Sequence, residues 1–125
     1  MSPVTISHIQ LELAREPGHP QGDSGHRYHL DLPLTADGHI DAEAFRRHRA
    51  LCKVTRIRPG EVTAFGRIVH GPGGRWSFDY NEATDRDDEA GYRLADERFV
   101  PGEYISIRED DGVMHTFRIV SVRQD

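Results

Sequence analysis

The residues best suited to binding a flat ligand lie in a hairpin near the middle of the chain. Residues 63–70 and 75–80 alternate apolar and polar side chains around the turn residues 71–74, a pattern that predicts two antiparallel strands. Reading across the turn pairs Val69 with Trp76, Arg67 with Phe78 and Phe65 with Tyr80. We therefore expect the aromatic rings of this hairpin to share one face with an arginine.

Two interpretations of this aromatic face are open. It can be a core face with Arg67 packed over a ring at its edge, because aromatic residues at strand spacing usually fill cores. It can instead be a partly exposed platform for a flat ligand, a single-stranded base or a protein partner. In the second interpretation the ligand-binding residues are Phe65, Arg67, Trp76, Phe78 and Tyr80.

The segment 46–58 is basic, although the net charge of the chain is −5. It has no acid between its cations, which are Arg46, Arg47, Arg49, Lys53, Arg56 and Arg58. These cations can pair with acids of the same fold, pair with acids of a second copy, or bind phosphate. Phosphate binding would make the protein a small nucleic-acid-binding barrel, which its negative net charge disfavours.

The segment 81–97 is acidic and could supply partners for those cations. Counted from Asp85, its acids loosely follow the spacing of a calcium-binding loop. Position six is Ala90 rather than glycine, and position twelve is Asp96 rather than glutamate. We therefore predict a solvated loop without calcium.

Histidine and cysteine spacing predicts neither a metal site nor a nucleophile. His26 and His29 are three apart on an expected strand, so they point to opposite faces. His48 and Cys52 are four apart on an expected helix and provide two ligands, whereas a structural zinc ion needs about four. A buried thiol is more often a small core residue, and we expect His115 to be a hydrogen-bonded histidine at the core edge.

The sequence contains no recognised catalytic motif. It has neither the Gly-x-Ser-x-Gly elbow of serine hydrolases nor a phosphate-binding loop that ends in Gly-Lys-Ser/Thr. We therefore assign no catalytic residue, no metal and no cofactor. A catalytic or metal site assembled from residues far apart in the sequence stays an alternative.

Most of the elements that position these residues are expected to be strands. Residues 5–14 and 27–34 alternate apolar and polar side chains, and the Gly- and Pro-rich residues 16–25 form a long loop between them. The next expected elements are a helix at 42–51, with Asp41 as its N-cap, and a strand at 52–58.

The closing segment, residues 99–122, predicts a second hairpin around Asp110-Asp111-Gly112. A loop of these three residues leaves one face of the hairpin mostly apolar. It pairs Ile105 with Phe117, Ile107 with His115 and Glu109 with Val113. Gly112 then occupies a left-handed bulge position, where the absence of a Cβ matters.

These elements predict a mainly β fold. We expect a single β-barrel-like domain over residues 1–125: a small antiparallel barrel or sandwich of about six to seven strands with one short helix. No apolar run approaches the roughly 20 residues that span a bilayer, and no secretory signal is visible. The lone Cys52 fits a reducing compartment, so we expect a cytoplasmic protein.

Two resemblances add to this interpretation. Residues 100–107, Val-Pro-Gly-Glu-Tyr-Ile-Ser-Ile, resemble a strand of the flavin-binding barrels of ferredoxin-reductase-like enzymes. In that family an Arg-x-Tyr-Ser motif follows and holds the flavin. The next strand here, residues 115–121, lacks the motif, so no flavin is expected.

The chain as a whole resembles a family of small bacterial proteins of unknown function. The shared stretches are Glu16–Gly18, Asp37–Asp41, Asp87–Tyr92 and Pro101–Gly112. This resemblance implies no activity, because the family has none assigned.

These features favour a non-enzymatic binding or protein-interaction module that associates with itself. Its acidic and basic segments are complementary, which favours a homodimer. The alternatives are a nucleic-acid-binding barrel that uses residues 46–58, and an enzyme or metal protein with a site built from distant residues.

Overall fold

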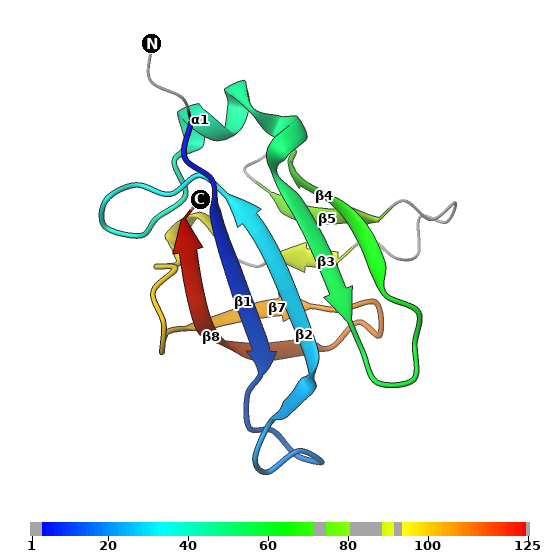
Figure 1. Cartoon of the computed structure of the whole chain (residues 1–125). Helices are drawn as coiled ribbons and strands as arrows, with labels where there is room; N and C mark the ends of the chain where they lie inside the picture. Colours follow the sequence, from blue (N-terminus) through cyan, green and yellow to red (C-terminus); the bar gives the residue numbers. More distant parts are fainter. Residues whose placement is uncertain (1–3, 72–74, 81–88, 92–93, 125) are drawn as a thin grey trace.

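The computed structural model describes residues 4–71, 75–80, 89–91 and 94–124. It is a closed antiparallel barrel in which each strand pairs with the next and β1 pairs with β8 (Figure 1). The strands are β1 (Ser7–Leu13), β2 (Asp23–Leu32), β3 (Lys53–Ile57), β4 (Ala64–His70), β5 (Trp76–Tyr80), β6 (Glu89–Gly91), β7 (Tyr104–Arg108) and β8 (Met114–Gln124). The predicted mainly β fold class is confirmed, and the sheet forms a barrel. The described residues contain eight strands, compared with the six to seven predicted, because they include the short β6.

One end of the barrel is covered by the helix α1 (Ala42–Arg47) and the 3₁₀ turn η1 (Arg49–Leu51) (Figure 1). Asp41 caps α1 as predicted, because its side chain accepts a hydrogen bond from the Ala44 N–H. The helix is shorter than predicted, since the chain leaves α-helical geometry at His48. The buried Phe45 packs edge-on against Trp76, with ring centroids 4.9 Å apart. A further 3₁₀ turn, η4 (Leu94–Asp96), precedes β7.

Alternating side chains of the strands fill the barrel interior. In β1 the inward positions are Ser7, Ile9, Leu11 and Leu13, and in β2 they are Tyr28, Leu30 and Leu32. This period of two is what the sequence pattern predicts for a sheet with one buried face. The strand β2 begins at Asp23, inside the segment predicted to be a loop.

The β7–β8 hairpin has the predicted register. Ile105 lies opposite Phe117 and Ile107 lies opposite His115. The Glu109 N–H donates to the Val113 carbonyl at 3.1 Å, which closes the predicted three-residue loop. Gly112 has a φ of 79°, in the left-handed region that favours glycine.

The predicted register of the β4–β5 hairpin is wrong by one residue. Gly66 lies opposite Tyr80, Ile68 opposite Phe78 and His70 opposite Trp76. The shift places Arg67 and Asp79 opposite each other on the outer face, whereas the predicted register would have buried the arginine against Phe78. It also requires glycine at position 66, because a Cβ there would lie 2.3 Å from the Asp79 carbonyl oxygen.

Candidate functional site

The end of the barrel opposite α1 contains a cluster of charged side chains that sequence analysis did not bring together. The β1–β2 and β3–β4 connections extend from this end (Figure 1). With the β7–β8 turn they surround a cleft of about 580 Å³, which we call the mouth cleft. Its charged and histidine side chains are Glu16, His19, Asp23, His26, Arg58, Glu61, Glu109, Asp110, Asp111 and His115.

Glu109 lies at the centre of the mouth cleft, and its side chain is only 2 % exposed. Its Oε2 atom accepts hydrogen bonds from Tyr28 at 2.5 Å, from His26 at 2.8 Å and from Arg58 at 3.1 Å. Its Oε1 atom lies 3.5 Å from Nε2 of His115. The carboxylate therefore joins side chains from β2, the β3–β4 connection and β8.

This environment keeps Glu109 ionised. Burial raises the pKa of its carboxyl group, but hydrogen bonds from His26 and Tyr28 and the charges of His26 and Arg58 outweigh that effect. The net result is a pKa of about 2. Glu109 is thus a buried negative charge at neutral pH, held by donors that match it.

Two cations, one in β3 and one directly after it, offset part of the negative charge at this end of the barrel. Arg58 binds Glu109, and its Nη2 atom also donates to Oδ1 of Asp110 at 3.0 Å. Arg56 is buried, and its Cζ atom lies 4.7 Å from the centroid of the Tyr80 ring. Its Nη1 atom lies 3.9 Å from Oδ2 of Asp110. Both guanidinium groups are therefore committed to contacts within the fold.

His115 contacts carboxylates through both of its ring nitrogens. Its Nδ1 atom lies 3.1 Å from the Glu16 carboxylate and its Nε2 atom lies 3.0 Å from Asp111. Burial lowers the pKa of His115, but the bonds to Asp111 and Glu16 and the charge of Glu109 outweigh burial and raise it above its usual value. The prediction of a hydrogen-bonded histidine at the core edge is confirmed.

His26 differs from His115 because one of its nitrogens has no partner. Its Nε2 atom bonds to Glu109, and its side chain is 15 % exposed. Within the described residues its Nδ1 atom has no hydrogen-bond partner. The Glu109 carboxylate orients the ring, so the Nδ1 atom of His26 can form a hydrogen bond with a molecule in the mouth cleft.

The mouth cleft is negative overall. Its lining includes six carboxylates, from Glu16, Asp23, Glu61, Glu109, Asp110 and Asp111, against the one arginine Arg58. When His115 is protonated, the six carboxylates still outnumber the positive charges of Arg58 and His115. A cleft lined mainly by one sign of charge concentrates ligands of the opposite sign. The arrangement therefore suits a cation.

The residues predicted to form an aromatic ligand platform do not share a surface. Trp76, Phe78 and Tyr80 are buried inside the barrel, so their interpretation as core residues is correct. Phe65, 60 % exposed, and Arg67 lie on the outer face of β4. The one-residue register shift separates the two groups.

The six basic residues of segment 46–58 are also divided between the ends of the barrel. Arg46, Arg47 and Arg49 are exposed on α1 and η1, and Arg47 pairs with Glu43 at 2.8 Å. Lys53 is exposed at the start of β3. Arg56 and Arg58 belong to the opposite end, in contact with the carboxylates of the mouth cleft. Pairing with the acidic segment 81–97 lies mostly outside the described residues, as does the calcium-loop comparison.

Cys52 is a buried core residue. Its thiol lies 3.5 Å from the His48 carbonyl oxygen, and burial together with the charge of Asp31 raises the pKa of the thiol to about 11. A thiol with this pKa stays protonated at neutral pH and is a poor nucleophile. Among the described residues, no group of histidine, cysteine, aspartate or glutamate side chains has the geometry to hold a metal ion.

The sequence did contain one signal of the mouth cleft. The predicted β7–β8 register placed Glu109 on the apolar face of the hairpin, and a carboxylate there requires buried donors. Those donors, His26, Tyr28 and Arg58, come from segments 51 to 83 residues away in the sequence. No local pattern could identify them.

No protein-family model, curated protein or solved structure matches the chain. In the part of the chain that the structure describes, no helix combines the length and apolar character needed to cross a membrane.

Proposed function

We propose that this protein is a non-enzymatic binding module whose mouth cleft takes a small organic cation, such as an amine or a guanidinium group. The observation that supports this most strongly is the excess of carboxylates around the cleft. The lone, buried Cys52 is in keeping with a role in the cytoplasm.

The cleft has both polar and apolar surfaces for such a ligand. Asp111 and Glu61 are each 52 % exposed, so their carboxylates can approach a cation without losing all of their hydration. Leu13, Pro17 and Pro59 also line the cleft and can contact the carbon skeleton of the ligand. Glu109 and Arg58 are already bonded to each other, so they shape the cleft rather than bind the ligand.

A matched pair of probes tests this proposal. Benzamidine and benzamide have nearly the same shape, but only benzamidine is positively charged. We expect benzamidine to shift the backbone amide signals of residues 109–115 in a saturable way, and benzamide to shift them far less. Equal shifts by both probes would show that charge does not contribute to binding. Absence of a saturable shift by benzamidine would rule out the proposed cation site.

Self-association is the second part of the proposal, and it involves the outer face of β4. Phe65 and Val69 are exposed there, with Arg67 between them. Arg67 lies opposite Asp79, and within the described residues neither side chain has an ion-pair partner. In a two-fold dimer each arginine could pair with the aspartate of the other copy around the Phe65 contacts.

Nucleic-acid binding is less well supported than either of these functions. The six basic residues do not form one continuous surface, because Arg56 is 6 % exposed and Arg58 binds carboxylates of the mouth cleft. The remaining cations lie near α1 and the start of β3. Retention of single-stranded or duplex oligonucleotides at about 50 mM salt would support the nucleic-acid alternative.

A further inference from the structure

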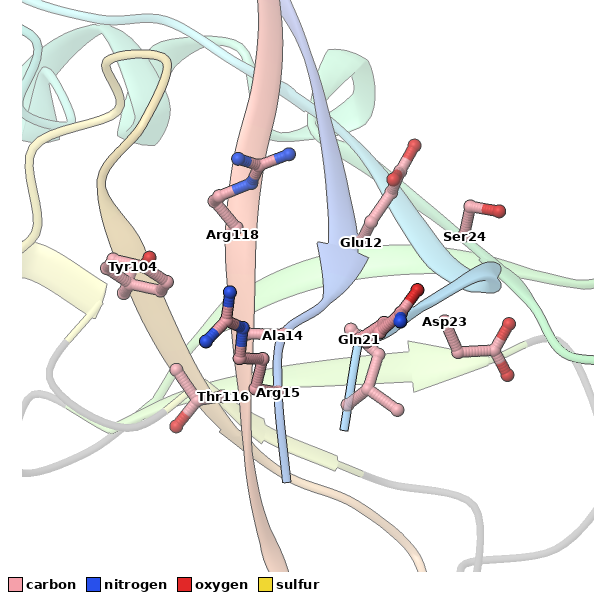
Figure 2. A pocket seen from close by; sticks show the side chains of 11 residues that line it. Glu12, Ala14, Arg15, Gln21, Asp23, Ser24, Tyr104, Thr116 and Arg118 are labelled. Atoms are coloured by element: carbon pink, nitrogen blue, oxygen red, sulfur yellow. The ribbon is translucent and has the colours of Figure 1, made fainter. Parts of the chain in front are cut away.

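We propose a second binding site on the outside of the barrel, which takes a flat ring that bears an anionic group. The site is a groove of about 950 Å³ between the β1–β2 connection and the outer face of β7 and β8. We call it the outer groove. The residues that define its anion-binding side are Arg15, Tyr104 and Arg118 (Figure 2).

Strand register brings these side chains together. Arg27 lies opposite Glu12, Glu12 lies opposite Arg118, and Arg118 lies opposite Tyr104. The four residues therefore form one row across β2, β1, β8 and β7, on the face of the sheet that points away from the core. Arg15 lies two residues after the end of β1 and lines the same groove.

The arginines of the groove are available to a ligand. Arg15 and Arg118 are both exposed, and neither forms an ion pair or a hydrogen bond with a residue in the described ranges. The exposed Arg47 differs, because it pairs with Glu43. Two unpaired guanidinium groups at one groove can form bidentate hydrogen bonds to a carboxylate or a phosphate.

Tyr104 provides the surface for a flat ring. The residue is 55 % exposed, and its ring makes no contact with another described aromatic residue. Figure 2 shows Tyr104 and the two arginines on the β7–β8 side of the groove. A ring stacked on Tyr104 would thus place its anionic substituent toward the arginines.

Two acids line the groove and limit where the anion can bind. The Glu12 carboxylate accepts a hydrogen bond from Gln10 at 3.3 Å, and the Asp23 carboxylate accepts one from the Gly25 N–H at 2.8 Å. In Figure 2 both lie across the groove from Tyr104. Glu12 also lies between Arg27 and Arg118 in the row, so two cations offset its charge. The anion therefore binds on the side of Arg15 and Arg118.

The outer groove and the mouth cleft bind ligands of opposite charge. Both are lined by Leu13 and Asp23, which border the β1–β2 connection from opposite sides. An anionic ligand of the outer groove is thus distinguishable from the organic cation proposed for the mouth cleft. A negative binding result at one site does not contradict the proposal for the other.

The test uses four probes with the full chain and follows backbone amide signals by NMR. Adenosine monophosphate and benzoate each combine a flat ring with an anion, and they represent a nucleotide source and an aromatic-acid source. Adenosine lacks the anion and inorganic phosphate lacks the ring. We expect one or both of the ring-bearing anions to shift residues 104 and 116–118 in a saturable way, and to bind at least 5-fold more tightly than adenosine or phosphate.

Three variants connect the binding to the named residues. Arg118→Gln should weaken the ring-bearing anion at least 5-fold, and Tyr104→Leu should weaken it without changing the response to inorganic phosphate. Arg123→Gln removes the same charge from another exposed position of β8 and should leave the affinity unchanged. No saturable shift with any ring-bearing anion would overturn the proposal. Equal losses in Arg118→Gln and Arg123→Gln would also overturn it, because they would indicate a general charge effect.

Discussion

Glu109 determines the geometry of the mouth cleft, because its carboxylate accepts hydrogen bonds from two side chains of β2 and from Arg58 in the β3–β4 connection. Burying a charge is costly unless donors surround it. Here Tyr28, His26 and Arg58 provide those donors. The same contacts fix the rings and the guanidinium group that border the cleft, so the stability of the site and its shape depend on one residue.

The first prediction is that Glu109→Gln lowers the free energy of unfolding by about 3 kcal/mol at neutral pH, because it removes the buried charge that binds Tyr28, His26 and Arg58. The folded-state pKa of Glu109, about 2, lies below its usual value of 4.5. Its contribution to stability is therefore fully present above pH 4.5 and disappears as the pH falls toward 2.

Urea denaturation at a series of pH values measures this effect. The difference between parent and Glu109→Gln should be largest at neutral pH and should shrink between pH 4.5 and pH 2. Glu103→Gln changes an exposed glutamate and provides the control, with little difference expected at any pH. A Glu109→Gln variant as stable as the parent at pH 7 would mean that the buried ion cluster contributes nothing net.

At the scale of the elements, the barrel depends on two glycines that serve different purposes. Gly66 allows the backbone of β5 to approach β4 closely, and Gly112 adopts a left-handed conformation in the β7–β8 turn. One constraint involves a neighbouring strand, whereas the other is local to the chain. This difference explains why sequence analysis predicted one hairpin register correctly and missed the other.

The second prediction concerns Gly66. A Cβ at this position would lie 2.3 Å from the Asp79 carbonyl oxygen and 2.7 Å from the Tyr80 Cα, and both are backbone atoms. We expect Gly66→Ala to destabilise the protein by about 2 kcal/mol or more, because the two strands must separate. Thermal unfolding measures the loss. Gly71→Ala is the matched control, since its Cβ would have its nearest contact at 3.8 Å; equal melting of the two variants would contradict the observed β4–β5 register.

The third prediction concerns Gly112, whose φ is 79° and whose added Cβ would meet no atom within 4 Å. Any loss of stability on substitution therefore comes from the backbone conformation and not from steric contact with neighbouring atoms. Gly112→Val should lose about 1–3 kcal/mol, because a β-branched residue resists positive φ. Gly112→Asn should lose less, since asparagine adopts this region more readily. Denaturation of both variants gives the comparison, and a valine variant that unfolds like the parent would be the contrary result.

The sequence was sufficient for elements whose causes are local. Asp41 caps α1 through the Ala44 N–H three residues away, and the loop ending at Gly112 follows from alternation in β7 and β8. It was insufficient where the cause lies across the sheet, as for Gly66 against the β5 backbone. The mouth cleft is the extreme case, because His26 and Glu109 are 83 residues apart.

At the scale of the whole molecule, unlike charges gather at different places on one small barrel. The mouth cleft is acidic, whereas α1 and η1 present exposed arginines at the other end (Figure 1). The outer face of β4 adds exposed apolar residues beside Arg67, which has no ion-pair partner among the residues that the structure describes. Such a surface favours association that charges orient and apolar contact stabilises.

The fourth prediction is that the chain forms a dimer at micromolar concentration through the outer face of β4. Sedimentation should give twice the 14.2 kDa of one chain, and high salt should weaken but not abolish the dimer. Phe65→Ser should shift the equilibrium toward monomer, whereas Val62→Ser, an exposed residue of the β3–β4 connection, should not. A single species of 14.2 kDa in both low and high salt would contradict the proposed interface.

The carboxylates of the mouth cleft are proposed to bind an organic cation. The most direct test is the affinity for benzamidine of a variant in which two of these carboxylates are replaced by amides. The side chains of Glu61 and Asp111 are each 52 % exposed, and changing them to Gln and Asn leaves the buried Glu109 carboxylate in place. A unit charge about 4 Å away contributes about 1 kcal/mol in water. Loss of two such charges should therefore weaken benzamidine binding about 30-fold at low salt. Glu103→Gln, outside the cleft lining, should bind as the parent does. A double variant with the parent's affinity would contradict the account.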